Sequence, residues 1–201
     1  MPGKPLKDYA DAIIETATNK LIQGCNSTII PSSATEIGDS AFYRCTSLTS
    51  VVIPSSVTMI GWNAYGSCTS LTSIVIPSSV TAIGGKAFRD CTSLTSIVIP
   101  EGVKKIGECA FQVCTSLTSV AINGKIKKID RGTFRGCTAL ESITLPTGVN
   151  KIEESAFLSC TSLKAIYVPA KKYDYYYERI PSPFNSLIVE MEPVKKAKKK
   201  K

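Results

Sequence analysis

Residues 68 to 90 read C-T-S-L-T-S-I-V-I-P-S-S-V-T-A-I-G-G-K-A-F-R-D, and the stretches on either side repeat this text with few changes. Each copy begins with a cysteine, and six of these cysteines follow one another at intervals of 23 residues: Cys45, Cys68, Cys91, Cys114, Cys137 and Cys160. Self-similarity at a fixed period is typical of solenoids, in which each unit buries its apolar face only against its neighbours. The sequence therefore predicts a repeat protein whose function lies on a surface rather than in a pocket.

The repeat defines the expected domain organisation. Five complete copies begin at Cys45 and end before Cys160, a shortened copy occupies Cys25 to Arg44, and a last copy loses the pattern after Pro169. This gives about seven coils of 23 residues. We expect a solenoid over residues 25–169, flanked by an N-terminal cap at 11–24 and a C-terminal cap at 170–193. Residues 1–10 are expected to be flexible, and residues 194–201 form a Lys-rich tail that we expect to be disordered.

Within one unit, the residue pattern predicts two short extended segments and a tight turn. Leu71 to Ile76 alternates apolar and polar residues and is rich in β-branched side chains, which indicates a strand that ends at Pro77. Val80 to Ile83 suggests a second extended segment, which Gly84 ends. The residues through Phe88 are expected to form a 3₁₀ or helical turn back to the next cysteine. Repetition of this unit predicts a β-solenoid with parallel strands and short turns.

The apolar positions of the unit recur in every coil and are expected to stack into ladders that form the core. One ladder is aromatic and comprises Phe42, Tyr65, Phe88, Phe111, Phe134 and Phe157. The repeat cysteines are expected to pack inside as small hydrophobic residues with free thiols. Metal binding is not expected, because the chain has no histidine and no closely spaced cysteine pairs.

The unit L-x-x-I-x-I-P-x-x-V-x-x-I-G-x-x-A-F-x-x-C resembles the BspA-like class of leucine-rich repeat, and the match runs from Cys25 to Pro169. The resemblance implies a leucine-rich-repeat-like, right-handed solenoid. It also implies a bacterial protein at the cell surface or secreted, with a role in adhesion or protein recognition and without catalytic residues. The N-terminal residues lack the apolar region of a secretory signal, so a cytoplasmic location is the alternative.

The two caps depart from the repeat text. At the N-terminal end, apolar pairs surround Ala17 to Asn19 and suggest a hairpin or an incomplete coil, although Tyr9, Ile13 and Ala17 also permit a helix. At the C-terminal end, the tyrosine-rich stretch 171–179 predicts a short helix before Pro181, followed by a strand over residues 186–191.

The formal net charge of +8 is concentrated at the C-terminus, where six lysines lie within residues 195–201. Such a run is expected to be solvated, and it either serves only as a solubilising end or binds nucleic acid or anionic surfaces weakly and in a salt-dependent way. No apolar stretch is long enough for a membrane-spanning helix.

Outward-facing residues of the predicted strands form columns that are candidate binding surfaces. A contiguous exposed apolar column beside hydroxyl groups often marks an interaction surface, although strand propensity alone also accounts for Val and Thr. A second candidate is a basic patch, which meets an acidic partner or is simply a solvated face. The candidate partner-binding residues are Thr49, Val52, Thr72, Val75, Thr95, Val98, Thr118 and Tyr167, and the basic patch comprises Lys104, Lys105, Lys127, Lys128 and Lys151.

Enzymatic function is not expected, because the sequence lacks histidine, a Gly-rich phosphate loop and paired carboxylates. No cofactor is expected. The favoured interpretation is a monomeric binding module that recognises a protein or glycan on a host or neighbouring cell. The alternative is a structural or intracellular scaffold whose lysine tail makes the contacts. Cys109 is expected to face solvent, where its thiol either dimerises the protein on oxidation or is an incidental substitution.

Overall fold

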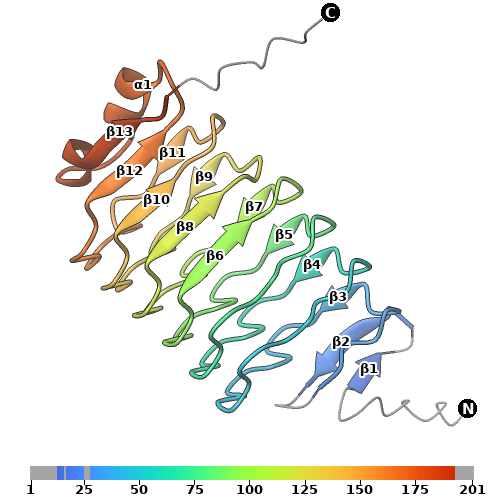
Figure 1. Cartoon of the computed structure of the whole chain (residues 1–201). Coiled ribbons are helices and arrows are strands. Elements are labelled where there is room, and N and C mark those ends of the chain that lie inside the picture. Colours follow the sequence, from blue (N-terminus) through green and yellow to red (C-terminus); the bar gives the residue numbers. More distant parts are fainter. Residues whose placement is uncertain (1–12, 16, 25–27, 193–201) are drawn as a thin grey trace, which may run out of the picture.

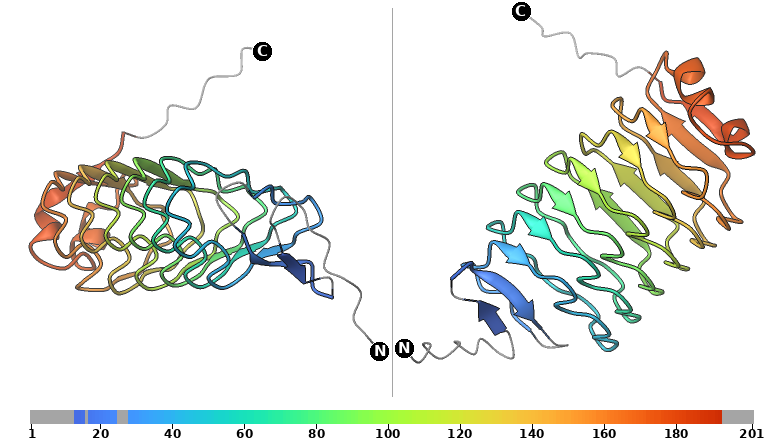
Figure 2. Two further views of the ribbon diagram at one scale, coloured as in Figure 1. Left: turned by 90° about the horizontal axis from the view of Figure 1, so that it is seen from below. Right: turned by 180° about the vertical axis from the view of Figure 1, so that it is seen from behind.

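A computed structural model describes residues 13–15, 17–24 and 28–192 of the chain. The repeat units wind into stacked coils, and the stack forms an elongated block with one cap at each end (Figure 1). Two rows of parallel strands run along the block, one row on each side (Figure 2). The predicted parallel-strand solenoid of about seven coils is confirmed.

The first row contains the longer strands. Neighbouring strands of the repeat units pair in parallel with a register of 23 residues, so that Ser96 lies beside Ser119 and Ser142 beside Ala165. The last strand of the row pairs with an offset of 22 residues, with Ile188 beside Ile166. The row comprises β6 (Ser96–Ile99), β8 (Ser119–Ile122), β10 (Ser142–Thr144), β12 (Ala165–Val168) and β13 (Ile188–Glu190).

The prediction of a strand at Leu71 to Ile76 is wrong for that coil. The segment forms only the single bridge between Val52 and Val75. The first coil is three residues shorter than the others and contributes no strand to this row among its described residues. Among the described residues, the strand ladder of this row starts at β6, in the coil that begins at Cys91.

The second row contains strands of two residues each. They are β3 (Glu36–Ile37), β4 (Met59–Ile60), β5 (Ala82–Ile83), β7 (Lys105–Ile106), β9 (Lys128–Ile129) and β11 (Lys151–Ile152). The pairing is continuous from β3 to β7, and β9 pairs with β11 as a separate sheet.

Glycines follow the first strands of this row because the coils approach closely there. A Cβ atom added to Gly107 would lie 2.3 Å from the backbone nitrogen of Gly85, and one added to Gly84 would lie 2.6 Å from the carbonyl oxygen of Gly61. Neither separation leaves room for a side chain. In the next coil Asp130 takes the place of the glycine, and the break in the ladder between β7 and β9 falls at this substitution.

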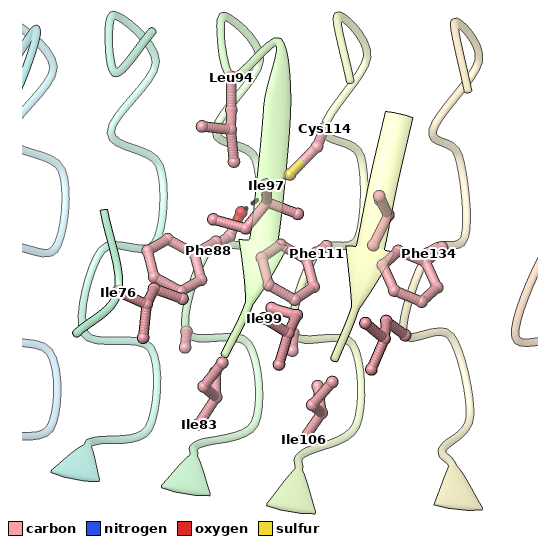
Figure 3. Packing of buried hydrophobic residues seen from close by; sticks show 14 of the residues in the cluster. Ile76, Ile83, Phe88, Leu94, Ile97, Ile99, Ile106, Phe111, Cys114 and Phe134 are labelled. Carbon is pink, nitrogen blue, oxygen red and sulfur yellow. Dashed lines mark hydrogen bonds between the residues drawn. The ribbon is translucent and has the colours of Figure 1, made fainter. Parts of the chain in front are cut away.

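The core is a set of ladders in which like residues stack on like. In the aromatic ladder, consecutive rings from Phe42 to Phe157 have centroids 4.9 to 5.9 Å apart and lie within 9° of parallel. Figure 3 shows Phe88, Phe111 and Phe134 side by side with Ile76, Ile99 and other isoleucines below them. The stack ends on Phe184 of the C-terminal cap, whose ring meets Phe157 edge to face at 5.8 Å. The predicted inward positions are buried in most coils, whereas Cys45 and Val51 are only partly buried.

The repeat cysteines do more than fill space. Each buried thiol donates a hydrogen bond to the carbonyl oxygen of the aromatic residue 26 positions earlier, as in Cys114 to Phe88 at 3.2 Å (Figure 3). The same bond recurs for Cys68, Cys91, Cys137 and Cys160 at 3.0 to 3.1 Å. The expectation that these residues act simply as small hydrophobic groups was incomplete, because their thiols also satisfy buried carbonyl groups.

The N-terminal cap is a hairpin, not the helix that the spacing of Ile13 and Ala17 also allowed. Strand β1 (Ile13–Glu15) pairs antiparallel with β2 (Lys20–Gln23). Strand β2 then pairs in parallel with β3, so the hairpin extends the second row of strands.

The C-terminal cap contains the helix α1 (Tyr173–Tyr177), the 3₁₀ helix η1 (Phe184–Leu187) and β13. The strand expected over residues 186–191 is therefore shorter than predicted, because η1 occupies its first residues. The buried Tyr176 donates a hydrogen bond from its hydroxyl to the carbonyl of Pro146 and anchors the cap to the solenoid. The expected flexible residues 1–10 and the Lys-rich tail lie outside the described residues.

Candidate interaction surfaces

The first row of strands carries an exposed apolar column on its outward face. Val52, Val75 and Val98 have 84%, 79% and 56% of their surface exposed. Tyr167 continues the column at 36% exposure. We use the name apolar column for the outward residues of this row in chain order: Ile29, Val52, Val75, Val98, Ala121, Thr144, Tyr167 and Val189.

Two residues of the apolar column were missed by sequence reasoning. Ile29, which is 70% exposed, stands two positions before Pro31, just as Val52 stands two positions before Pro54. That spacing was a usable signal. Val189, which is 41% exposed, joins the column because β13 pairs with β12 and brings it beside Tyr167. This last strand lies outside the repeated sequence, so no comparable signal in the sequence indicates that Val189 joins the column.

Shallow grooves separate neighbouring members of the apolar column. One groove of about 360 Å³ lies between the coils that carry Val75 and Val98, and its lining includes Pro100. Another of about 260 Å³ lies between Ile29 and Val52. Ridges of β-branched side chains alternating with grooves give this face a regular relief that extended or strand-like partners can match.

Beside the apolar column, Thr49, Thr72, Thr95 and Thr118 form a second exposed column, which we call the threonine column. Hydroxyl groups of this column are already engaged in hydrogen bonds. The hydroxyls of Thr72, Thr95 and Thr118 each donate to the backbone carbonyl of the threonine one coil earlier, at 3.1 to 3.4 Å. Their donors are therefore used to join the coils, which leaves methyl groups and acceptor oxygens toward solvent. Thr49 occupies the corresponding exposed position at the start of the column.

The predicted basic patch divides into two parts. Lys104, Lys105 and Lys127 are exposed at the second row of strands. Lys128, by contrast, forms ion pairs with Asp130 at 2.7 Å and Glu153 at 2.8 Å.

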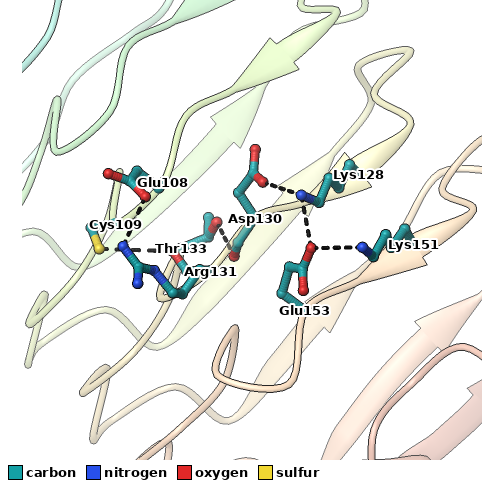
Figure 4. A network of polar contacts seen from close by, with 8 residues as sticks. All are labelled: Glu108, Cys109, Lys128, Asp130, Arg131, Thr133, Lys151 and Glu153. Carbon is teal, nitrogen blue, oxygen red and sulfur yellow. Dashed lines mark hydrogen bonds and ion pairs between the residues drawn. The ribbon is translucent and has the colours of Figure 1, made fainter.

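Lys151 approaches the same Glu153 carboxylate at 3.0 Å, so two lysines and two carboxylates form a connected network (Figure 4). Two hydrogen bonds raise the pKa of Lys128: the one to Asp130 has the larger effect, and the one to Glu153 the next largest. The hydrogen bond from Lys128 lowers the pKa of Glu153. At this end of the patch the positive charge is balanced by the carboxylates.

Cys109 is half-buried, and its thiol lies 3.7 Å from the carbonyl oxygen of Arg131, close to the ion pair of Arg131 with Glu108 (Figure 4). It is thus less accessible than the solvent-facing position expected for it. Within the described residues, no group of three potential metal-ligating side chains is gathered, and no helix has the length and apolar character needed to cross a membrane.

Comparison with known families gives one match, described as a BspA type leucine rich repeat region, over residues 15–84 and 58–178 with six copies. A leucine-rich repeat protein from Bacteroides ovatus is 32% identical, with a TM-score of 0.68; the alignment covers 82% of this chain and 46% of that one. The chain thus spans less than half the length of that relative. The comparison with curated proteins gave no match.

Two further solved structures are similar. The T. pallidum leucine-rich repeat protein is 27% identical, with a TM-score of 0.68 and coverage of 89% of this chain and 92% of that one. The pneumococcal vaccine antigen PcpA is 18% identical, with a TM-score of 0.79 and coverage of 90% and 46%. The similarity to PcpA shows a shared fold alone.

Proposed function

Because the chain belongs to the BspA type leucine-rich repeat family, we propose that it is a non-enzymatic recognition module that binds a protein partner through the apolar column. Repeat solenoids of this kind offer extended, regular surfaces for recognition. The partner is a protein on a host or neighbouring cell, and the module acts at the cell surface, as the family resemblance implies. We further propose that it acts as a monomer.

The exposure of the apolar column is the observation that carries this proposal. Val52 and Val75 each leave about four fifths of their surface in water. Removing such surface from water stabilises a complex by about 25 cal/mol per Å². The bridge between Val52 and Val75, the parallel pairing of β6 to β13 and the hydroxyl bonds of the threonine column join the backbones that carry these side chains. Binding to a surface fixed in advance costs little conformational entropy.

A specific feature favours the alternative function, a scaffold whose lysine tail makes the contacts. The outward residues of successive coils are nearly identical, whereas a specific site usually breaks repetition. The lysines at residues 195–201 form a concentrated cation that attracts nucleic acid or other anionic polymers. In this alternative the solenoid supplies length alone.

The two functions predict different behaviour when the tail is removed. The probes are three host-matrix proteins: fibronectin, laminin and collagen. We expect a version of the chain that ends at Pro193 to bind such a protein as tightly as the full chain does. The affinity should change less than about threefold between low and high salt, because apolar contacts are not screened. Surface plasmon resonance measures both quantities, with duplex DNA as the comparison ligand.

Binding that disappears with the tail or at high salt would overturn the proposal and support the scaffold. Binding of DNA by the full chain alone, with no matrix protein retained by the shortened chain, would have the same meaning.

A further inference from the structure

Trp62, the only tryptophan in the sequence, breaks the repeat at an exposed turn. It directly follows Gly61 after β4, and 47% of its surface is exposed. The other coils have small or charged residues at this position: Asp39, Gly85, Glu108, Arg131 and Glu154. The other coils stack without an aromatic side chain at this position, so the repeat does not require the exposed indole, which is a candidate ligand contact.

The indole forms one wall of a hollow of about 450 Å³. The lining includes backbone of Gly84, Gly85 and Gly107, where the coils approach too closely for a side chain at Gly84 or Gly107. The floor is therefore rigid main chain. The polar lining comes from Asp39, Lys105, Glu108 and Asp130. The volume falls within the range of small-molecule sites, about 300 to 1,000 Å³.

Neighbouring residues hold the tryptophan in place. Its backbone N–H donates a hydrogen bond to Oδ1 of Asp39 at 2.7 Å. The ammonium group of Lys86 lies 5.1 Å from the ring centroid, in a cation–π contact. Gly85 leaves the space beside the ring open, since a Cβ atom there would come within 3.4 Å of indole Cδ1. Asp39 thus holds the backbone of Trp62, and Lys86 contacts its ring, beside the hollow.

The carboxylates around the hollow are each held by a hydrogen bond or an ion pair. Asp39 accepts the N–H of Trp62, Glu108 pairs with Arg131 at 3.2 Å, and Asp130 pairs with Lys128 at 2.7 Å (Figure 4). Arg131 and Lys128 offset the negative charge of Glu108 and Asp130, and the hydrogen bond from Trp62 orients the carboxylate of Asp39. Such a lining favours a neutral ligand with hydroxyl donors over a cation or an anion.

We propose that this hollow binds a neutral carbohydrate. A pyranose ring has an apolar C–H face and a rim of hydroxyl groups, which match the indole face of Trp62 and the acceptor oxygens of Asp39 and Glu108. The site lies along β4, β5 and β7 of the second row of strands, whereas the apolar column lies on the first row. The inference therefore goes beyond the protein-binding function proposed above and does not depend on it.

The test uses the fluorescence of Trp62, which is the chain's single indole. The full chain is titrated with glucose, galactose, mannose, N-acetylglucosamine, lactose and cellobiose, and with sialyllactose and a heparin disaccharide as charged probes. We expect a saturable emission change with at least one neutral sugar, and calorimetry should show binding at least about tenfold weaker for Trp62→Ala. The substitution should leave the fold intact, because the next coil has glycine at this position.

Two matched variants separate the site from general effects. Glu154→Ala alters the equivalent position of a coil without tryptophan, and Val75→Asp alters the apolar column; both should bind the sugar like the unmodified protein. The proposal is overturned if no neutral sugar gives a saturable signal, if the charged probes bind more tightly, or if Trp62→Ala binds sugar normally. Loss of a protein ligand alone in Trp62→Ala would show a protein contact instead, and would equally overturn it.

Discussion

Replacing Phe111 with alanine is expected to lower the free energy of unfolding by about 4 kcal/mol. The ring is fully buried and lies between Phe88 and Phe134, with centroids 5.2 and 5.6 Å away. The alanine would leave a cavity in the middle of the aromatic ladder, and both neighbouring rings would lose a partner. Because each coil is stabilised by its neighbours, a central defect weakens two coil interfaces at once. Urea denaturation followed by circular dichroism measures the change.

Tyr65→Phe is the matched control in the same ladder. The Tyr65 hydroxyl is fully buried and has no hydrogen-bond partner among the described residues. Removing it deletes an unsatisfied polar group while preserving the ring, so we expect a gain of about 1 kcal/mol. A loss below about 1 kcal/mol for Phe111→Ala would contradict the view that the aromatic ladder carries a large share of the stability.

The second large effect is loss of stability at alkaline pH. Burial raises the pKa of the Cys68 and Cys160 thiols from an ordinary value of 9.0 to about 12, and it raises the pKa of Cys91 and Cys114 as well. Between pH 9 and pH 12 the unfolded chain has lost these protons while the folded chain still holds them. The unfolded state then binds fewer protons, so the free energy of unfolding falls as pH rises in this window.

The expected slope is about 1.4 kcal/mol per pH unit for each such thiol. From pH 9 to pH 11, Cys68 and Cys160 together remove on the order of 5 kcal/mol, which is comparable to the whole stability of many domains. Denaturant titrations at a series of pH values measure the slope. In a Cys68→Ala, Cys160→Ala variant, the fall in the free energy of unfolding per pH unit should be smaller by the contribution of two thiols. An unchanged slope would contradict the assignment of the effect to these thiols.

The ladder architecture could be predicted from sequence because every coil repeats the same inward residues. The position of Phe88 in one coil fixes that of Phe111 in the next, and 23-residue pairing of the strands follows. The exposure of Val52, Val75 and Val98 followed from the same alternation. Their use as a binding surface remains a proposal.

Features that depend on departures from the repeat could not be predicted in the same way. Strand β13 lies outside the repeat text, so Val189 was not assigned to the apolar column. The break in the second row of strands depends on how closely coils approach at Gly107 and Asp130, which requires coordinates.

Interactions between coils were also hidden from the sequence. Lys128 appeared as one member of a basic patch, whereas its ion pair joins it to Glu153, 25 residues later. The hollow beside Trp62 combines residues from several coils that are far apart along the chain. A single unusual residue was visible, but its surroundings were not.

The measurement that most directly tests recognition through the apolar column compares two double variants of the full chain. Val75→Asp with Val98→Asp places two charges in the column. Ser55→Asp with Ser78→Asp adds the same charge at exposed turn positions where the next coil naturally has Glu101. Circular dichroism of both variants confirms that the fold is retained.

Binding to fibronectin, laminin and collagen is then measured by surface plasmon resonance at high salt. We predict binding about 100-fold weaker for the variant in the apolar column, because the charges must be desolvated against an apolar partner surface. The serine variant should bind like the unmodified protein. Equal binding by both double variants, or no binding of any of these probes by the unmodified chain, would contradict the claim that this face recognises a protein partner.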